Sequence, residues 1–122
     1  MNSTQLGRWG EEQAAAFLQK QGCQLLSRNY RSPFGEIDLI MEQGQILLFV
    51  EVKLRKNRAF GGAAAAVTLS KQQKLILTAQ AWLASEKRES QVARFDVVEI
   101  YAPYGAAGDY QVNWIPNAFE VT

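Results

Sequence analysis

The chain has 122 residues, 13 of them basic and 12 acidic, and its hydrophobic fraction of 48% is enough to build one folded core. It has no histidine, which excludes a Ser-His-Asp triad, a histidine general base and histidine-bound zinc or haem. The single cysteine, Cys23, excludes an internal disulfide and any multi-cysteine metal site. Any chemistry must therefore rely on Asp, Glu, Lys, Ser, Thr or Tyr side chains, or on a hard metal ion.

A first helix is predicted over residues 7–21. Trp9, Phe17 and Leu18 lie on an apolar stripe near the helical period of 3.6 residues. Gly22 follows at the place where a glycine commonly ends a helix. These features together indicate one amphipathic helix that covers a sheet.

Three strands are predicted next, over residues 23–30, 36–42 and 45–54, with turn-forming residues between them. The third contains residues 46–50, a run that is apolar on both faces. Such a strand is typical of the centre of a sheet that is covered on both sides.

Membrane and export signals are not found in the pattern. The run over residues 46–50 is the longest strongly apolar one, and a membrane-spanning helix needs about 20 such residues. The first residues lack a basic segment followed by an apolar one, as a secretory signal would have. We therefore expect a cytoplasmic protein that is not embedded in a membrane.

Residues 55–67 are first basic and then rich in glycine and alanine, which predicts a surface loop. Ser70, followed three residues later by Gln73, forms a capping-box pattern that predicts a second helix over residues 70–85.

The remaining chain predicts a fourth strand over residues 94–101 and a short edge strand over residues 110–115, ended by Pro116. The element order is α-β-β-β-α-β, and a helical crossover makes the third and fourth strands parallel. We predict an α/β fold with a mixed sheet flanked by helices. It forms one domain over residues 1–122, with a core over about residues 5–101 and a tail over residues 102–122.

Basic residues dominate the segment 52–85, which contains no acidic residue. In a nearly neutral protein such a segment is typical of a phosphate-facing patch, or else of a solvated loop and helix face. The basic residues of this segment are Lys53, Arg55, Lys56, Arg58, Lys71 and Lys74.

Two pairs of charged side chains interrupt the second and third strands. Glu36 and Asp38 are two residues apart, as are Glu51 and Lys53, so each pair shares one face of its strand. Counting back from a tight turn at residues 43–44 places Asp38 opposite residues 48–49, near the level of Glu51.

Two carboxylates and a lysine in this position can carry metal-dependent chemistry. Mg²⁺ takes oxygen ligands from one or two carboxylates plus phosphate and water. The lysine can then orient or deprotonate an attacking water. The alternative is an ordinary surface ion pair between Glu51 and Lys53, with Asp38 capping a turn.

The segments Gly-Glu-Ile-Asp-Leu-Ile (35–40) and Phe-Val-Glu-Val-Lys (49–53) resemble the Asp…Glu-x-Lys signature of the PD-(D/E)xK nuclease superfamily. More closely, the chain resembles the YraN family of small bacterial proteins, which are regarded as distant relatives of archaeal Holliday-junction resolvases. The resemblance also covers Gly7-Arg8-Trp9-Gly10-Glu11, Arg28-Asn29-Tyr30-Arg31, Phe60-Gly61, Lys71 and Arg94-Phe95-Asp96-Val97-Val98.

This resemblance implies a restriction-endonuclease-like αβββαβ core and a Mg²⁺- or Mn²⁺-dependent endonuclease that hydrolyses DNA phosphodiester bonds. It assigns metal binding to Asp38 and Glu51 and the catalytic lysine to Lys53. Glu11 matches the first-helix acid that completes the metal site in related resolvases; alternatively, it is an acid favoured by the helix dipole. Ile37 stands where the superfamily has a proline before its first acid.

The resemblance further implies branched or structured DNA as substrate, a role in DNA repair or recombination, and a homodimer. Candidates for phosphate contact are Arg55, Lys56, Arg58 and Lys71. Two alternatives remain, a non-catalytic nucleic-acid-binding module of nuclease descent and an interaction protein. For Arg94 and Asp96 we predict a structural ion pair that braces the fourth strand.

Overall fold

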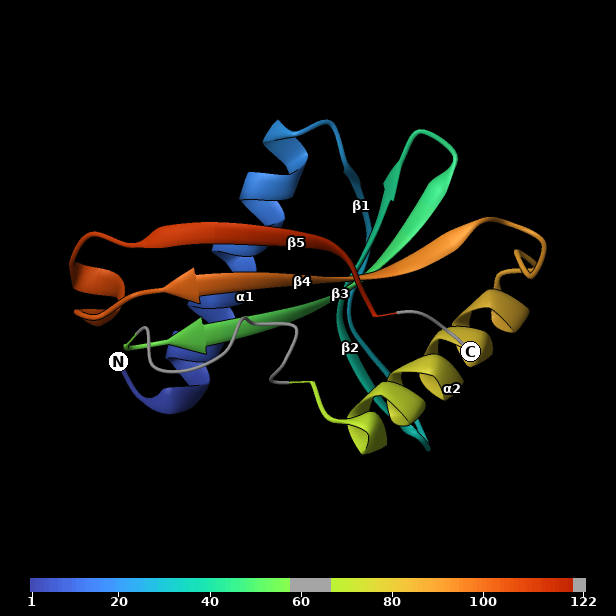
Figure 1. Cartoon of the computed structure of the whole chain (residues 1–122), viewed down its shortest axis with the longest axis horizontal. Helices are drawn as coiled ribbons and strands as arrows, with labels where there is room; N and C mark the ends of the chain where they lie inside the picture. The colour runs from blue at the N-terminus through green and yellow to red at the C-terminus, as the bar shows by residue number, and fades with distance from the viewer. Residues whose placement is uncertain (58–66, 120–122) are drawn as a thin grey trace.

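The computed structural model describes residues 1–57 and 67–119, and Figure 1 shows its elements in chain order. The predicted α-β-β-β-α-β order is confirmed, and the tail adds a further strand. The elements are α1 (Ser3–Lys20), β1 (Gln24–Ser32), β2 (Gly35–Gln43), β3 (Ile46–Arg55), α2 (Leu69–Ser85), β4 (Ala93–Tyr101), the 3-10 helix η2 (Gly105–Ala107) and β5 (Gln111–Phe119).

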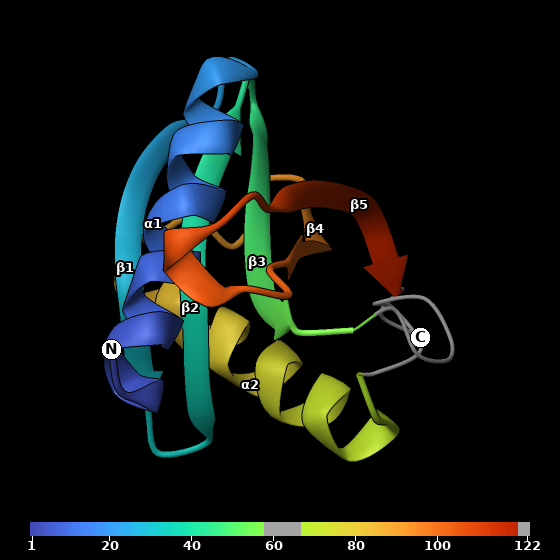
Figure 2. The same cartoon turned by 90° about the vertical axis from the view of Figure 1, so that its left-hand side faces the viewer.

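The strands form one sheet in the order β1-β2-β3-β4-β5. β3 and β4 are parallel, as the crossover through α2 predicts, and the other neighbours are antiparallel. α1 covers one face of the sheet and α2 covers the other (Figure 2). The mixed α/β architecture with a restriction-endonuclease-like core is therefore confirmed.

β3 is the central strand and is covered on both faces, as predicted. Leu48 and Val50 pack into the apolar cluster beneath α1, whereas Leu47 and Phe49 pack into the cluster beneath α2. All four side chains are buried. The strand that carries Glu51 is therefore fixed from both sides.

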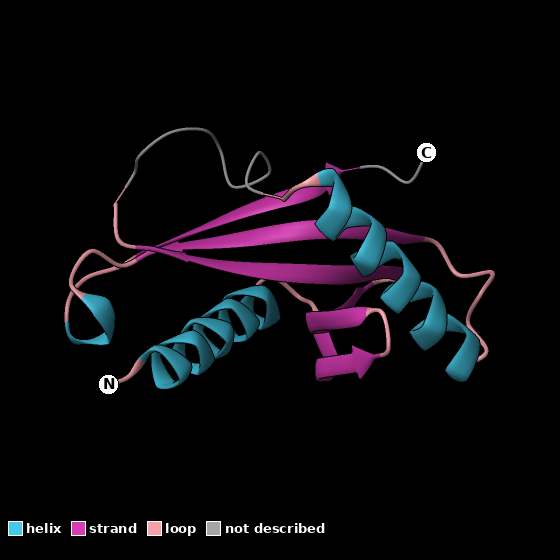
Figure 3. Ribbon diagram, turned by 90° about the horizontal axis from the view of Figure 1, so that it is seen from below, coloured by secondary structure: helices cyan, strands magenta, loops and turns pink. Residues whose placement is uncertain are grey.

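The β1–β2 hairpin turns away from the rest of the sheet. Seen from below, it projects between α1 and α2, while β3, β4 and β5 run across the molecule (Figure 3). The paired residues of β2 and β3 run from Gln43 with Ile46 to Leu39 with Val50. Beyond that last pair the two strands separate, and Asp38 lies at the point of separation.

α1 begins at Ser3, earlier than the predicted start at residue 7, because Asn2 and Gln5 form a capping box. The N–H of Gln5 donates to Asn2 Oδ1 at 2.8 Å, and the N–H of Asn2 donates to Gln5 Oε1 at 2.9 Å. Gly22 has a φ of +92°, in agreement with its predicted place after the helix end. Across residues 1–57 and 67–119, neither α1 nor any other helix has the length and apolar character to span a membrane.

The predicted cap of α2 at Ser70 is wrong. The N-cap is Thr68, whose Oγ1 accepts the N–H of Lys71 at 3.2 Å. Both residues carry a hydroxyl group that can cap a helix, and the backbone reaches the extended cap conformation at Thr68. Lys71 is therefore the third residue of α2, and its backbone N–H is the one that the cap satisfies.

The predicted end of the edge strand at Pro116 is also wrong, because β5 continues to Phe119. Proline is tolerated at a sheet edge, where its missing N–H breaks no ladder bond. Asn117 then adopts a φ of +51°, and its N–H donates to a carboxylate oxygen of Asp96 at 2.9 Å.

Asp96 ties the last two strands together. It is buried, and it accepts hydrogen bonds from Arg94 Nε at 3.0 Å and from Trp114 Nε1 at 2.8 Å, besides the one from Asn117. The predicted structural ion pair of Arg94 with Asp96 is therefore confirmed.

Replacing Asp96 by alanine should lower the free energy of unfolding by roughly 2–4 kcal/mol, because it leaves buried donors without an acceptor. Urea unfolding followed by tryptophan fluorescence measures this change. Asp109→Ala removes an exposed carboxylate and serves as the control, with an expected change of less than about 0.5 kcal/mol. Equal effects of the two substitutions would contradict the bracing role of Asp96.

Candidate active site

Asp38 and Glu51 meet where β2 and β3 separate. With the strands no longer paired at this level, the N–H of Val52 donates to Asp38 Oδ2 at 2.8 Å. The carboxylate of Asp38 thus satisfies a backbone group that the opening of the sheet leaves without a ladder partner. Glu51, the neighbour of Val52, brings a second carboxylate to the same place.

The register predicted for this hairpin is wrong, although the predicted neighbourhood of Asp38 and Glu51 holds. Leu48 pairs with Met41 and Phe49 pairs with Ile40, rather than with Asp38. The cause is the turn, in which Gln43 pairs with Ile46. Gly44, with a φ of +60°, and the residue after it form the turn, so the register shifts and brings Asp38 closer to Glu51 than predicted.

The side-chain alternation of β2 also breaks at Asp38. Ile37 packs beneath α2 and Leu39 packs beneath α1, although residues two apart normally share one face. On β1, Asn29 lies between the pairs Arg28–Leu39 and Tyr30–Ile37, and it has a φ of +49°. Both strands of the hairpin are therefore irregular at the level of the first predicted metal-binding acid.

Glu51 is buried and faces two ammonium groups. Lys71 Nζ lies 2.6 Å from Glu51 Oε1, and Lys53 Nζ lies 3.7 Å from the same oxygen. Lys71 is predicted from sequence as a phosphate contact, and α2 brings it into the acidic site itself. One carboxylate oxygen thus has two cationic partners.

The environment shifts the pKa values of three groups in the candidate active site. Burial, reinforced by the negative charge of Glu51, raises the pKa of Asp38 to about 7, although the hydrogen bond from Val52 opposes the shift. Burial and the charge of Lys71 lower the pKa of Lys53. Burial also acts to lower the pKa of Lys71, but its hydrogen bond and ion pair with Glu51 outweigh burial and raise it.

Glu11 lies at the margin of this site, on α1. Its Oε1 accepts a hydrogen bond from Asn29 Nδ2 at 3.0 Å, and the same nitrogen donates to Glu36 Oε1 at 2.9 Å. The charges of Glu11 and Glu36 add to the rise in the pKa of Asp38. Asn29 carries no predicted role, although it belongs to the segment 28–31 that resembles the YraN family, and asparagine is the residue type that best tolerates a positive φ.

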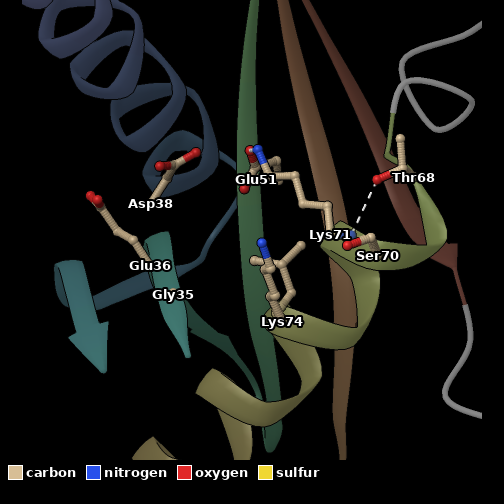
Figure 4. Close-up of a pocket in the computed structure, with 9 residues that line it drawn as sticks. Gly35, Glu36, Asp38, Glu51, Thr68, Ser70, Lys71 and Lys74 are labelled. Carbon is tan, nitrogen blue, oxygen red and sulfur yellow. Dashed lines mark hydrogen bonds and ion pairs between the residues drawn. The ribbon is translucent and has the colours of Figure 1, made fainter. Parts of the chain in front are cut away.

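An open cavity of about 390 Å³ lies between the hairpin and α2. In Figure 4, Glu36 and Asp38 lie on the β2 side, Lys71 and Lys74 on the α2 side, and Glu51 between them. The residues that line the cavity are Gly35, Glu36, Asp38, Glu51, Thr68, Ser70, Lys71, Lys74 and Leu75.

The other predicted phosphate contacts lie elsewhere. Arg55 Nε is 2.8 Å from Glu99 Oε2 on β4, as an ion pair without hydrogen-bond geometry. Lys56 lines a separate pocket beside Tyr104. Arg58 lies outside the described residues. Lys74 lines the acidic cavity instead, and its place in the basic segment is the sequence signal that points to it.

The residues present suit a hard divalent cation. Asp38 and Glu51 supply two carboxylates, and Mg²⁺ or Mn²⁺ completes such a set with water and phosphate oxygens. Burial is the main cause of the raised pKa of Asp38, and the repulsion from Glu51 adds to it; a bound cation would relieve this repulsion. Within residues 1–57 and 67–119, no three Asp, Glu or Cys side chains gather closely enough to hold one ion, so Glu11 stands apart from this pair.

The αβββαβ core is that of a restriction-endonuclease-like fold. Residues 10–100 match the family model described as Uncharacterised protein family UPF0102. The chain therefore belongs to this family, which is the YraN family.

Its relatives support this assignment. UPF0102 proteins of Vibrio campbellii, Nitrosomonas eutropha and Caldicellulosiruptor saccharolyticus are 46%, 46% and 40% identical to the chain, over 93%, 98% and 98% of its length. The alignments cover 91%, 98% and 100% of those relatives. The resemblance to the YraN family is thus confirmed over nearly the whole chain.

The raised pKa of Asp38 predicts a pH-dependent stability. In the unfolded chain this carboxyl ionises near 3.8, and in the folded protein near 7, so folding retains a proton between these values. The free energy of unfolding of wild type minus that of Asp38→Asn should therefore be constant below about pH 4. It should fall by roughly 2–4 kcal/mol as the pH rises from about 4 through 7. Urea unfolding in EDTA at several pH values measures it.

The control for this series is Asp109→Asn, which changes an exposed carboxyl in the same way. Its stability relative to wild type should vary little with pH. A difference between wild type and Asp38→Asn that stays flat from pH 4 to pH 8 would contradict the raised pKa.

Proposed function

We propose that this protein is a Mg²⁺- or Mn²⁺-dependent nuclease that hydrolyses phosphodiester bonds in DNA. The observation that carries the proposal is the meeting of Asp38 and Glu51 in an open cavity, with Lys53 and Lys71 beside Glu51. A purely structural domain has no need to place a partly buried acid, Asp38, beside a buried one, Glu51, because this arrangement costs stability.

The proposed roles follow from these groups. Asp38 and Glu51 hold the cation, which when bound stabilises negative charge on the phosphate and activates water. Lys53, whose pKa is lowered by burial and by Lys71, orients the attacking water and can accept its proton. Hydrolysis adds the hydroxyl of this water to phosphorus and a proton to the departing oxygen.

Lys71 and Lys74 are the proposed contacts to the DNA phosphates next to the reacting one. They project from α2 into the cavity on the side opposite Asp38 (Figure 4). Each such contact steepens the salt dependence of DNA binding by about one unit of slope. Branched or structured DNA as substrate, a homodimer, a cytoplasmic location and a role in repair or recombination stay predictions.

One observation favours the second candidate, a nucleic-acid-binding module that does not cleave. The 2.6 Å contact of Lys71 Nζ with Glu51 Oε1 occupies an oxygen that the cation would need. If that contact persists in the presence of metal, Lys71 and Asp38 would act only as structural groups beneath a DNA-binding surface. Metal binding and cleavage together separate these two candidates.

Replacing Lys53 by alanine should reduce cleavage by about 100-fold or more, because a positioned proton acceptor is lost. The measurement uses labelled linear duplex, single-stranded and four-way-junction DNA with Mg²⁺ or Mn²⁺. Lys20→Ala, at the C-terminal end of α1, is the control and should cleave like wild type. If wild type binds DNA without cleaving it, the binding module is favoured. If wild type shows no DNA binding and no cleavage, the proposal is overturned.

Replacing Lys71 by alanine should tighten Mn²⁺ binding about fivefold, because it removes the ammonium that competes for Glu51. The same substitution should weaken DNA binding, so its two effects have opposite signs. Isothermal titration calorimetry and DNA titration measure them. Lys74→Ala removes the same charge from the same cavity and controls for long-range electrostatics. An unchanged Mn²⁺ affinity in Lys71→Ala would contradict the competition.

A further inference from the structure

Asn29 combines an unusual backbone with a central place among the acids. It lies within β1, yet its φ of +49° is in the left-handed region that residues other than glycine rarely adopt. Such a conformation costs on the order of 1 kcal/mol and persists only where the surroundings hold it. A strained residue beside a candidate active site points to a role for its side chain.

The side chain of Asn29 connects two acids from different elements. Its Nδ2 carries two hydrogens and donates to Glu11 Oε1 of α1 at 3.0 Å and to Glu36 Oε1 of β2 at 2.9 Å. Arg31 Nε lies 3.5 Å from the other oxygen of Glu36. Glu36 is thus held on two sides, while Glu11 is held through Oε1.

We propose that Asn29 is a positioning residue, which holds Glu11 beside Glu36 at the margin of the site of Asp38 and Glu51, so that the negative charge of the Glu11 carboxylate assists cation binding by that pair. This inference rests on the proposed function, because it gives Glu11 a purpose only if a cation binds. The amide donors partly neutralise two carboxylates that would otherwise repel each other and Asp38.

The residue type agrees with this role. Glycine would adopt the same φ without strain, but it has no donor, and asparagine tolerates the conformation best among residues that carry an amide. Asn29 therefore keeps its side chain at the cost of backbone strain. Residues that orient a metal-binding side chain typically change the metal affinity 10–100-fold when they are replaced, which is on the order of the effect expected here.

The chain contains a matched control. Asn117 also has a positive φ, of +51°, and it lies on β5 rather than beside the acids. Its contact to Asp96 comes from the backbone N–H, which glycine retains. Asn117→Gly therefore makes the same chemical change, with the same relief of strain, away from the candidate active site.

The experiment measures Mn²⁺ affinity by isothermal titration calorimetry, together with the free energy of unfolding, for the full chain. Asn29→Gly should bind Mn²⁺ about tenfold more weakly than wild type while its stability is unchanged or higher. Asn117→Gly should keep the wild-type affinity. A merely structural role for Asn29 would lower stability and leave the affinity of the folded protein unchanged.

A double-mutant cycle tests whether Asn29 acts through Glu11. In a Glu11→Gln background, Asn29→Gly should cause little further loss of Mn²⁺ affinity. A further tenfold loss there would overturn the proposal, as would equal affinities of Asn29→Gly and Asn117→Gly. If wild type binds no Mn²⁺, both the proposed function and this inference fail, whereas normal binding by wild type with no effect of Asn29→Gly overturns only the inference.

Discussion

The crowding of carboxylates at the point where β2 and β3 separate is the constraint on which the site depends. Asp38 lies in that gap because its carboxylate accepts the N–H of Val52 at 2.8 Å. The strand pairing brings Glu51 to the same place. Glu51 is buried and Asp38 is partly buried, which makes their negative charges costly. The cationic groups that lower this cost at Glu51 are Lys71 from α2 and Lys53 from β3.

The rest of the fold supplies rigidity to this gap. β3 is packed on both faces, so Glu51 and Lys53 project from a strand that has little freedom to shift. The side-chain cap at Thr68 fixes the first turn of α2 and with it Lys71. At the far edge, Asp96 binds β5 to β4 and closes the sheet away from the site. The acid that braces the sheet is thus a different one from the acids of the candidate active site.

Much of this arrangement is predictable from sequence because it depends on local patterns. The run over residues 46–50 identifies the central strand, and the spacing of Asp38, Glu51 and Lys53 identifies the acids and the lysine that meet. The exact hairpin register is not predictable by counting, because a shift of the turn around Gly44 by one residue moves every pair.

Other features depend on contacts between distant segments. Thr68 and Ser70 are equally able to cap a helix by their chemistry, and the backbone conformation decides between them. The pairing of Arg55 with Glu99 requires knowledge of the neighbouring strand, and a basic residue of this kind looks in sequence like a phosphate contact. The left-handed backbone of Asn29 has no sequence pattern of its own beyond the residue type.

The nearly balanced charge of the chain has a local counterpart in the site. The formal net charge is +1, and the cavity likewise sets acids from β2 and β3 against lysines from α2. Under the proposed function, two anionic groups compete for the ammonium group of Lys71, namely the carboxylate of Glu51 and a DNA phosphate. If Lys71 moved to a phosphate, Glu51 would become available to a cation, so that DNA would raise the affinity for the metal. By thermodynamic linkage the metal must then raise the affinity for DNA by the same factor. Under the proposed function, a lysine shared between two anionic partners would therefore be sufficient to make metal and DNA bind cooperatively, without any larger change in the fold.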